Sequence, residues 1–123
     1  MAYPRVRAKY FNVTLAQMNA GYVIEVGRVG RTFTVVDGWC RANGGSAAAG
    51  TGVKVVDSAG TAACEWVVAN LTSAAIARIG VGADTATNLG TPLAKGSYLK
   101  VIGDGTLTTA ANGFDGVVYY TDT

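Results

Sequence analysis

Short segments of alternating apolar and polar residues, separated by glycine-rich turns, run along most of this chain of 123 residues. A period of two indicates strands with one buried face, and evenly spaced turns are typical of sandwiches and barrels. We expect about seven to nine short strands, joined as an all-β, antiparallel, jelly-roll-like β-sandwich. The expected strands are Tyr10–Thr14, Tyr22–Val26, Thr32–Ala42, Val53–Asp57, Cys64–Asn70, Tyr98–Ile102 and Phe114–Tyr120, with a shorter one at Thr106–Thr109.

Two segments depart from the strand pattern and predict short helical turns. Thr14 and Gln17 have the spacing of a capping box, and Gly21 is placed to end the helix after one or two turns. The segment 71–79 predicts a second helix, because Ile76 and Ile79 share a face at helical spacing.

Glycine also marks a bulge and a loop. Asp37 and Gly38 interrupt the longest strand, and a bulge there would re-aim Trp39. The small-residue segment 43–52 is expected to be an exposed loop with nothing to anchor it. The predicted core residues, each on an alternating strand, are Phe33, Val35, Val55, Val67, Val101 and Val118.

One domain is expected at 10–123, preceded by an extended arm at 1–9. Pro4 disfavours a helix in the arm, and Arg5, Arg7 and Lys9 alternate with apolar residues. The net charge of +2 is too small to predict nucleic-acid binding. The basic residues gather near the N-terminus, which favours an anionic protein as the partner.

Composition argues against catalysis. Ala, Gly, Val and Thr make up 67 of the 123 residues, charged residues only 15%, and there is no histidine, the side chain that titrates nearest neutral pH. The acidic residues are scattered singly. We therefore expect a structural or binding protein, with no enzymatic activity and no small-molecule substrate.

Cofactor motifs are incomplete. Gly80 and Gly82 begin a dinucleotide-type pattern whose third glycine position is Thr85. Asp104 and Asp115 lack the alternating oxygen ligands of a calcium loop. The two cysteines are too few, without histidine, for a zinc site. We expect no cofactor or metal, and we expect the two cysteines to be buried thiols.

The cellular setting is also predicted. No run of 18 apolar residues is present, so we expect no membrane-spanning segment. The first residues lack the apolar stretch of a signal peptide, which favours synthesis in the cytoplasm without export.

Tyrosines suit surfaces that are apolar on one side and wet on the other, which fits equally an interface between copies of the chain and the rim of a single sandwich. Six are present, and Tyr119 and Tyr120 must point to opposite faces of the last strand. Tyr22 and Tyr119 are the candidates for an interface between copies of the chain.

From Tyr10 to Tyr120 the chain resembles the small cement, or decoration, proteins of tailed bacteriophage capsids. The segments that carry the likeness are Asn12–Gly21, Tyr22–Val26, Val35–Gly45 and Gly116–Tyr120. The resemblance implies a β-sandwich that caps capsomer junctions on the outside of the virion. It further implies the major capsid protein as partner, a homotrimer as the working unit, and an N-terminal arm on the shell.

The residues expected to bind the capsid are Tyr3, Pro4, Arg5, Arg7, Lys9, Arg28 and Arg31. Two alternatives remain open. One is another virion part, such as a head-fibre base or a tail component. The other is a carbohydrate-binding β-sandwich, which ranks lower because both tryptophans, Trp39 and Trp66, lie within strands rather than on loops.

Overall fold

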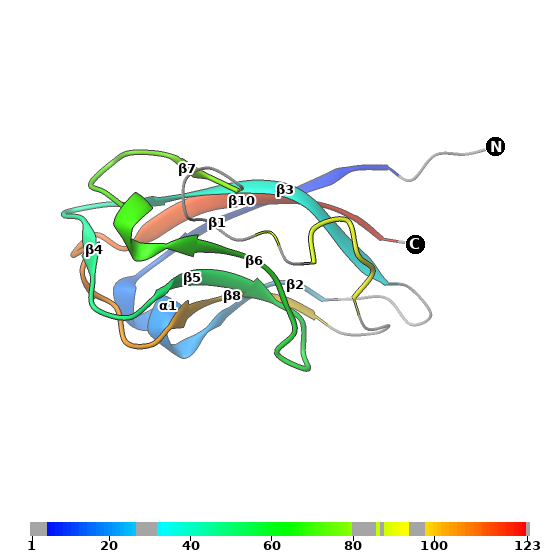
Figure 1. The fold of residues 1–123 in the computed structure, drawn as a ribbon, viewed down its shortest axis with the longest axis horizontal. Helices are drawn as coiled ribbons and strands as arrows, with labels where there is room; N and C mark the ends of the chain where they lie inside the picture. Colours follow the sequence, from blue (N-terminus) through cyan, green and yellow to red (C-terminus); the bar gives the residue numbers. More distant parts are fainter. Residues whose placement is uncertain (1–4, 27–31, 80–85, 87, 94–97, 123) are drawn as a thin grey trace.

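The computed structural model describes residues 5–26, 32–79, 86, 88–93 and 98–122. These residues form two layers of strands with a short helix at one end (Figure 1). The elements are β1 (Arg7–Val13), α1 (Leu15–Ala20), β2 (Tyr22–Val26), β3 (Phe33–Ala42), β4 (Ala47–Ala48), β5 (Gly52–Val56), β6 (Ala62–Val67), the 3-10 turn η1 (Val68–Asn70), β7 (Ala77–Arg78), β8 (Tyr98–Asp104), β9 (Thr108–Thr109) and β10 (Phe114–Asp122).

The strands form two four-stranded sheets and one small ribbon. Sheet A has the order β1-β10-β3-β7, sheet B has the order β2-β8-β5-β6, and β4 pairs with β9. The strand pairs in all three are antiparallel. The predicted all-β antiparallel sandwich is thus confirmed, while the jelly-roll connection stays a prediction.

The core lies between sheets A and B and is built from the inward side chains of both. Its largest fully buried members include Trp66, Tyr120, Phe114 and Met18. Five of the six predicted core residues are buried, at 0–2% exposure. Val67 is half-buried at the end of β6, where Cys64 and Trp66 take the inward positions.

The predicted capping box is confirmed at the start of α1. The Gln17 N–H donates to the Thr14 hydroxyl oxygen at 3.1 Å, and the Thr14 N–H donates to the Gln17 side-chain oxygen at 2.9 Å. Two of the N–H groups that a helix start leaves without partners are thereby satisfied. The helix ends at Gly21, as its sequence indicates.

The helix predicted at 71–79 is wrong. The segment instead runs beside β3, where the Ala74 N–H donates to the Ala42 carbonyl at 2.8 Å and Ala77 pairs with Cys40. Ala74 has a φ of 59°, which a helix does not allow. Sheet pairing satisfies more of the segment's backbone groups than one isolated helical turn would.

The segment 43–52 is anchored, contrary to expectation. Ala47 and Ala48 form β4, which pairs with Thr109 and Thr108 of β9, and the Ala47 N–H donates to the Leu71 carbonyl at 2.9 Å. Ala47 is only 8% exposed. The short strand predicted near Thr106–Thr109 is therefore present, and its partner is the segment thought to be a free loop.

Two further predictions concern the chain's beginning and its cysteines. Arg7 and Lys9, expected in the arm, belong to β1 and pair with Tyr120 and Val118 of β10. The cysteines form no disulfide and are buried, Cys40 on β3 of sheet A and Cys64 on β6 of sheet B, at 0% and 1% exposure. The buried thiols are thus confirmed.

Candidate functional site

A row of side chains crosses the outer face of sheet A, away from the core. Tyr10, Val117, Trp39 and Arg78 are successive register partners on β1, β10, β3 and β7, so they share one face. Tyr10 is 73% exposed and Trp39 is half-buried. Val117 is fully buried although it is not part of the core between the sheets, so its outer-face neighbours cover it.

A bulge in β3 places the polar and aromatic groups of this face. Tyr120 of β10 pairs with Val35 and Tyr119 pairs with Asp37, so Val36 has no partner in the register. Both Val36 and Asp37 are exposed. The bulge lies one residue before its predicted position and has the predicted effect, because a one-residue insertion turns the following side chains to the opposite face. Trp39 therefore points outward.

Glycine is required where β3 resumes after the bulge. A Cβ on Gly38 would come within 2.8 Å of the Val117 carbonyl oxygen and 3.3 Å of the Trp66 ring. The strands β3 and β10 can approach this closely because position 38 carries no side chain. The close approach sets the position of the neighbouring Trp39.

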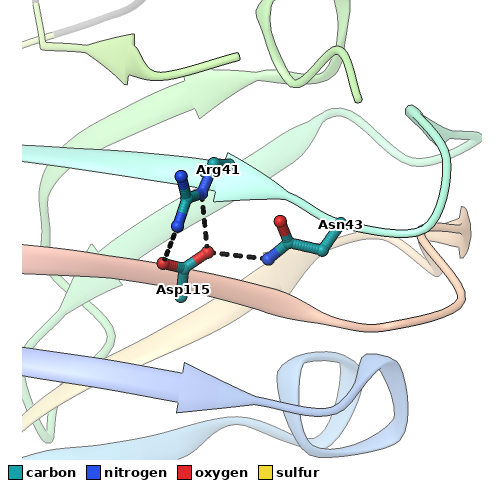
Figure 2. Close-up of polar contacts among 3 residues, drawn as sticks. All are labelled: Arg41, Asn43 and Asp115. Carbon is teal, nitrogen blue, oxygen red and sulfur yellow. Dashed lines mark hydrogen bonds and ion pairs between the residues drawn. The ribbon is translucent and has the colours of Figure 1, made fainter. Parts of the chain in front are cut away.

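Arg41, Asn43 and Asp115 form an ion-paired cluster (Figure 2). The Arg41 guanidinium donates to both oxygens of the Asp115 carboxylate, at 3.0 Å and 2.7 Å, and the Asn43 amide donates to the same carboxylate at 2.7 Å. The hydrogen bonds from Arg41 are the largest cause of a lowered Asp115 pKa. The same guanidinium lies 5.8 Å from the centroid of the Trp39 ring. The bidentate pair thus holds a cation against the indole.

Two depressions lie beside β7. One, of about 400 Å³, is lined by Val6, Val36, Asp37, Gly38, Trp39, Arg78 and Tyr119. The other, of about 330 Å³, is lined by Ala69, Asn70, Thr72, Ala75, Ile76, Ala77 and Arg78. Arg78 lines both. We call the first depression, with its Asp37, Trp39, Arg78 and Tyr119 lining, the β3–β7 depression.

A second surface lies where β1 ends sheet A and β2 ends sheet B. We call it the β1–β2 edge. Its exposed apolar and basic members are Tyr10, Tyr22, Val23 and Val26, with Arg5 and Arg7 beside them. Lys9 and Glu25 join the two strands by an ion pair of 3.3 Å. Four of the seven large apolar side chains that are exposed in the described residues belong to this edge.

The predicted capsid-binding residues are only partly placed. Arg5 and Arg7 are exposed at the β1–β2 edge, whereas Lys9 is half-buried and paired with Glu25. Four others, Tyr3, Pro4, Arg28 and Arg31, lie outside the described residues.

The predicted interface tyrosines lie in different sheets. Tyr22 is 40% exposed on β2 of sheet B, while Tyr119 is half-buried on the outer face of sheet A. Tyr120 is 1% exposed, so the prediction that Tyr119 and Tyr120 face opposite sides of β10 is confirmed.

Sequence reasoning missed the cluster around Trp39. Asp115 lies 74 residues from Arg41 and 72 residues from Asn43 in the sequence. The available signal was the parity of β3. The bulge precedes Gly38, and after it Cys40 and Ala42 face inward. Trp39 and Arg41, which alternate with them, must therefore both face outward.

The residues considered for a metal site or a dinucleotide motif lie in separate parts of the chain. Asp104 lies 3.9 Å from the Lys54 ammonium on sheet B, and Asp115 is bound to Arg41 on sheet A. In the described ranges no three His, Cys, Asp or Glu residues are grouped for a metal ion. Gly80, Gly82 and Thr85 fall outside those ranges. The helices that are described all lack the length and apolar character needed to cross a membrane.

No protein-family model, no curated protein and no solved structure matches the chain.

Proposed function

We propose that this chain is a decoration, or cement, protein of a tailed-phage head, which binds the outer surface of the shell and stabilises it without catalysing a reaction. The observation that carries the proposal is the β1–β2 edge, where exposed apolar side chains and exposed arginines occur together. The partner is the major capsid protein, and the location is the outside of the virion. The resemblance to decoration proteins supplies this setting.

Apolar exposure at the β1–β2 edge supports a protein as the partner. Val26 is 69% exposed and Val23 is 42% exposed, both on β2, a strand that ends its sheet. Strands that end a sheet leave backbone N–H and C=O groups open to pairing, and exposed apolar patches mark interaction sites. Such an edge suits the addition of a strand or loop from a neighbouring protein.

Charge at the same edge indicates which kind of protein surface it fits. Arg5 and Arg7 are exposed, while the carboxylate of Glu25 is already bound to Lys9 and to the Tyr120 hydroxyl. The edge therefore presents two exposed guanidinium groups to a partner. A carboxylate-rich shell surface is the complementary partner, and it would speed association most at low salt.

Self-association is part of the proposal, with a homotrimer as the working unit. Tyr22 at the β1–β2 edge and Tyr119 on the outer face of sheet A are the proposed interface tyrosines. Because they lie in different sheets, a ring of copies can use the two as the two halves of a head-to-tail contact. Light scattering on the purified protein gives the mass of the assembly, and a mass of one chain at every concentration would contradict the trimer.

Co-sedimentation with phage heads tests the function. Heads of the encoding phage, assembled without this protein, are mixed with the wild-type chain and with Val26→Ser and Arg7→Ala. We expect saturable binding that falls several-fold in each variant, and the Arg7→Ala loss should shrink as salt is raised.

Matched controls come from elsewhere on the surface. Ile76→Ser removes an apolar side chain of 49% exposure near β7, and Lys54→Ala removes a cation from β5, which is not adjacent to β2 in sheet B. Both controls should bind as the wild type does. Equal losses in controls and edge variants would place the docking surface elsewhere, and no binding of the wild-type chain would reject the function.

A further inference from the structure

We propose that the β3–β7 depression is a binding site for neutral oligosaccharide chains. This activity is separate from shell docking, because the depression lies on the outer face of sheet A and uses none of the residues assigned to the β1–β2 edge. The inference does not rest on the proposed function.

The size of the two depressions and the residue they share suit a chain-like ligand. The β3–β7 depression of about 400 Å³ and its neighbour of about 330 Å³ both fall within the range of ligand pockets, about 300–1,000 Å³. Arg78 lines both, so a chain-like ligand crossing β7 contacts the two depressions in succession. A linear polymer of rigid rings is long enough to contact both depressions, whereas a small compact molecule occupies only one of them.

Aromatic side chains supply the apolar part of the site. Trp39 and Tyr119 both line the β3–β7 depression and both are half-buried, each with part of its surface open to solvent. Sugar rings present C–H groups on their faces, and a large rigid aromatic side chain offers contact area at low cost in conformational entropy. Trp39 therefore provides the surface against which a sugar face packs, while Tyr119 is shared with the proposed contact between copies of the chain.

The platform is held in place before any ligand arrives. Arg41 lies against the Trp39 ring and is itself fixed by two hydrogen bonds to Asp115, which Asn43 also holds. Gly38, next to Trp39 on β3, lets this strand lie close to β10. A side chain that is already fixed loses little entropy on binding, so the contact energy is retained as affinity.

Polar groups of both kinds line the depression. Asp37 is exposed, and one of its oxygens accepts the Gly38 N–H at 2.8 Å, which orients the carboxylate. Arg78 is exposed on β7 and donates through a planar fork. Sugar hydroxyls both donate and accept, so adjacent hydroxyls can bond to the carboxylate and to the guanidinium.

The balance of charge selects the ligand class. One carboxylate, Asp37, and one guanidinium, Arg78, line the β3–β7 depression, so its lining carries no net charge. A polyanion such as a nucleic acid or a sulfated glycan would meet Asp37, and a polycation would meet Arg78. A neutral oligosaccharide is repelled by neither charge and can use both groups as hydrogen-bond partners.

Two indole signals make the test specific. The chain has two tryptophans, of which Trp66 is fully buried and Trp39 lines the β3–β7 depression. Indole N–H signals in ¹H–¹⁵N spectra are followed while cellohexaose, maltohexaose and chitohexaose are added in turn at millimolar concentration. We expect at least one of these to shift the Trp39 signal progressively and leave Trp66 in place, with Trp39→Phe identifying the signals.

Variants tie the response to the lining. Asp37→Ala and Arg78→Ala change exposed side chains, and each should weaken binding by about tenfold, the loss of hydrogen bonds to a charged group. Lys100→Ala on the outer face of sheet B should bind as the wild type does. Spectral dispersion of each variant reports that it is folded.

Several outcomes would overturn the proposal. These are no shift of Trp39 with any of the three sugars, unchanged affinity in both Asp37→Ala and Arg78→Ala, or a heparin hexasaccharide that binds more tightly than every neutral sugar. A response to an unstructured peptide library with none to the sugars would assign the depression to protein binding instead. Shell binding by Arg78→Ala is measured in parallel, and its retention keeps the two functions distinguishable.

Discussion

Tyr120→Phe removes one hydroxyl from the core and tests how the two sheets are joined near the β1–β2 edge. The Tyr120 hydroxyl donates to the Glu25 carboxylate at 2.7 Å, linking β10 of sheet A to β2 of sheet B. The ring is 1% exposed and packs edge-on against Phe33, with centroids 5.4 Å apart. Phenylalanine keeps that ring contact, so the change isolates the hydrogen bond.

The expected loss is about 1 kcal/mol of unfolding free energy at neutral pH. Hydrogen bonds to charged groups contribute about 1.5–3 kcal/mol when well buried and about 1 kcal/mol when neutral. The Glu25 side chain is 27% exposed, so water replaces part of the lost bond, and Lys9 still pairs with the carboxylate at 3.3 Å. The lower end of the range therefore applies, which corresponds to a decrease in Tm of about 3–5 °C.

The loss should depend on pH. Burial by itself would raise the pKa of Glu25, but the bonds from Tyr120, from the Val26 N–H and from Lys9 outweigh it and lower the pKa. A carboxylate with a lowered pKa stabilises the fold above its ordinary pKa, about 4.3, and this stabilisation is lost as the pH falls through the folded-state value. The difference between wild type and Tyr120→Phe should therefore shrink in acid.

Urea unfolding at about pH 7 and about pH 2 measures both effects, because the slope gives the free energy at each pH. Tyr119→Phe is the matched control, since its side chain faces outward on the neighbouring position of β10 and should change stability by less than about 0.5 kcal/mol. The reasoning fails if Tyr120→Phe is as stable as the wild type at neutral pH, or if its deficit is equally large in acid.

Three further substitutions test the core, a turn and the outer-face cluster by the same urea assay. Val101→Ala, at 0% exposure, should cost about 0.5–3 kcal/mol, and no change would place position 101 outside the core. Gly113→Ala should cost more than about 2 kcal/mol, because its φ is 80° and the new Cβ would overlap the Val13 carbonyl oxygen; a stable variant would refute that geometry. Asp115→Asn should destabilise the protein near neutral pH, and the deficit should shrink as the pH falls from about 3.9 through the lower folded-state value, because the hydrogen bonds from Arg41 lower the Asp115 pKa; a deficit that stays equally large in acid would contradict it.

Local patterns predicted the strands and α1 well, and long-range pairing decided the rest. The capping box at Thr14 acts within four residues, so it is visible in the sequence. The segment 71–79 has helical spacing, yet its backbone pairs with Ala42 and Cys40 some thirty residues away, which no local pattern reveals. For the same reason β4 and β9, each two residues long, were not recognised as partners.

The outer-face cluster was hidden for a related reason. The bulge near Asp37 was predicted, but its effect on Trp39 depends on which face of β3 is inward, and that is set by the partner strand β10. Lying within a strand was therefore no reason to discount Trp39 as an exposed aromatic. Asp115, weighed in the sequence as a calcium ligand, proved to bind Arg41 because the register of β3 and β10 places the two residues opposite each other.

The reactivity of the two buried cysteines reports how often each sheet opens to solvent. Cys40 belongs to sheet A and Cys64 to sheet B, and neither is more than 1% exposed. A thiol reagent can react only when the strand that carries the thiol separates from its cover, so each modification rate reports the free energy of opening at that layer. Equal rates at Cys40 and Cys64 would mean that the sandwich opens as one unit, whereas faster labelling of one would identify the layer that yields first.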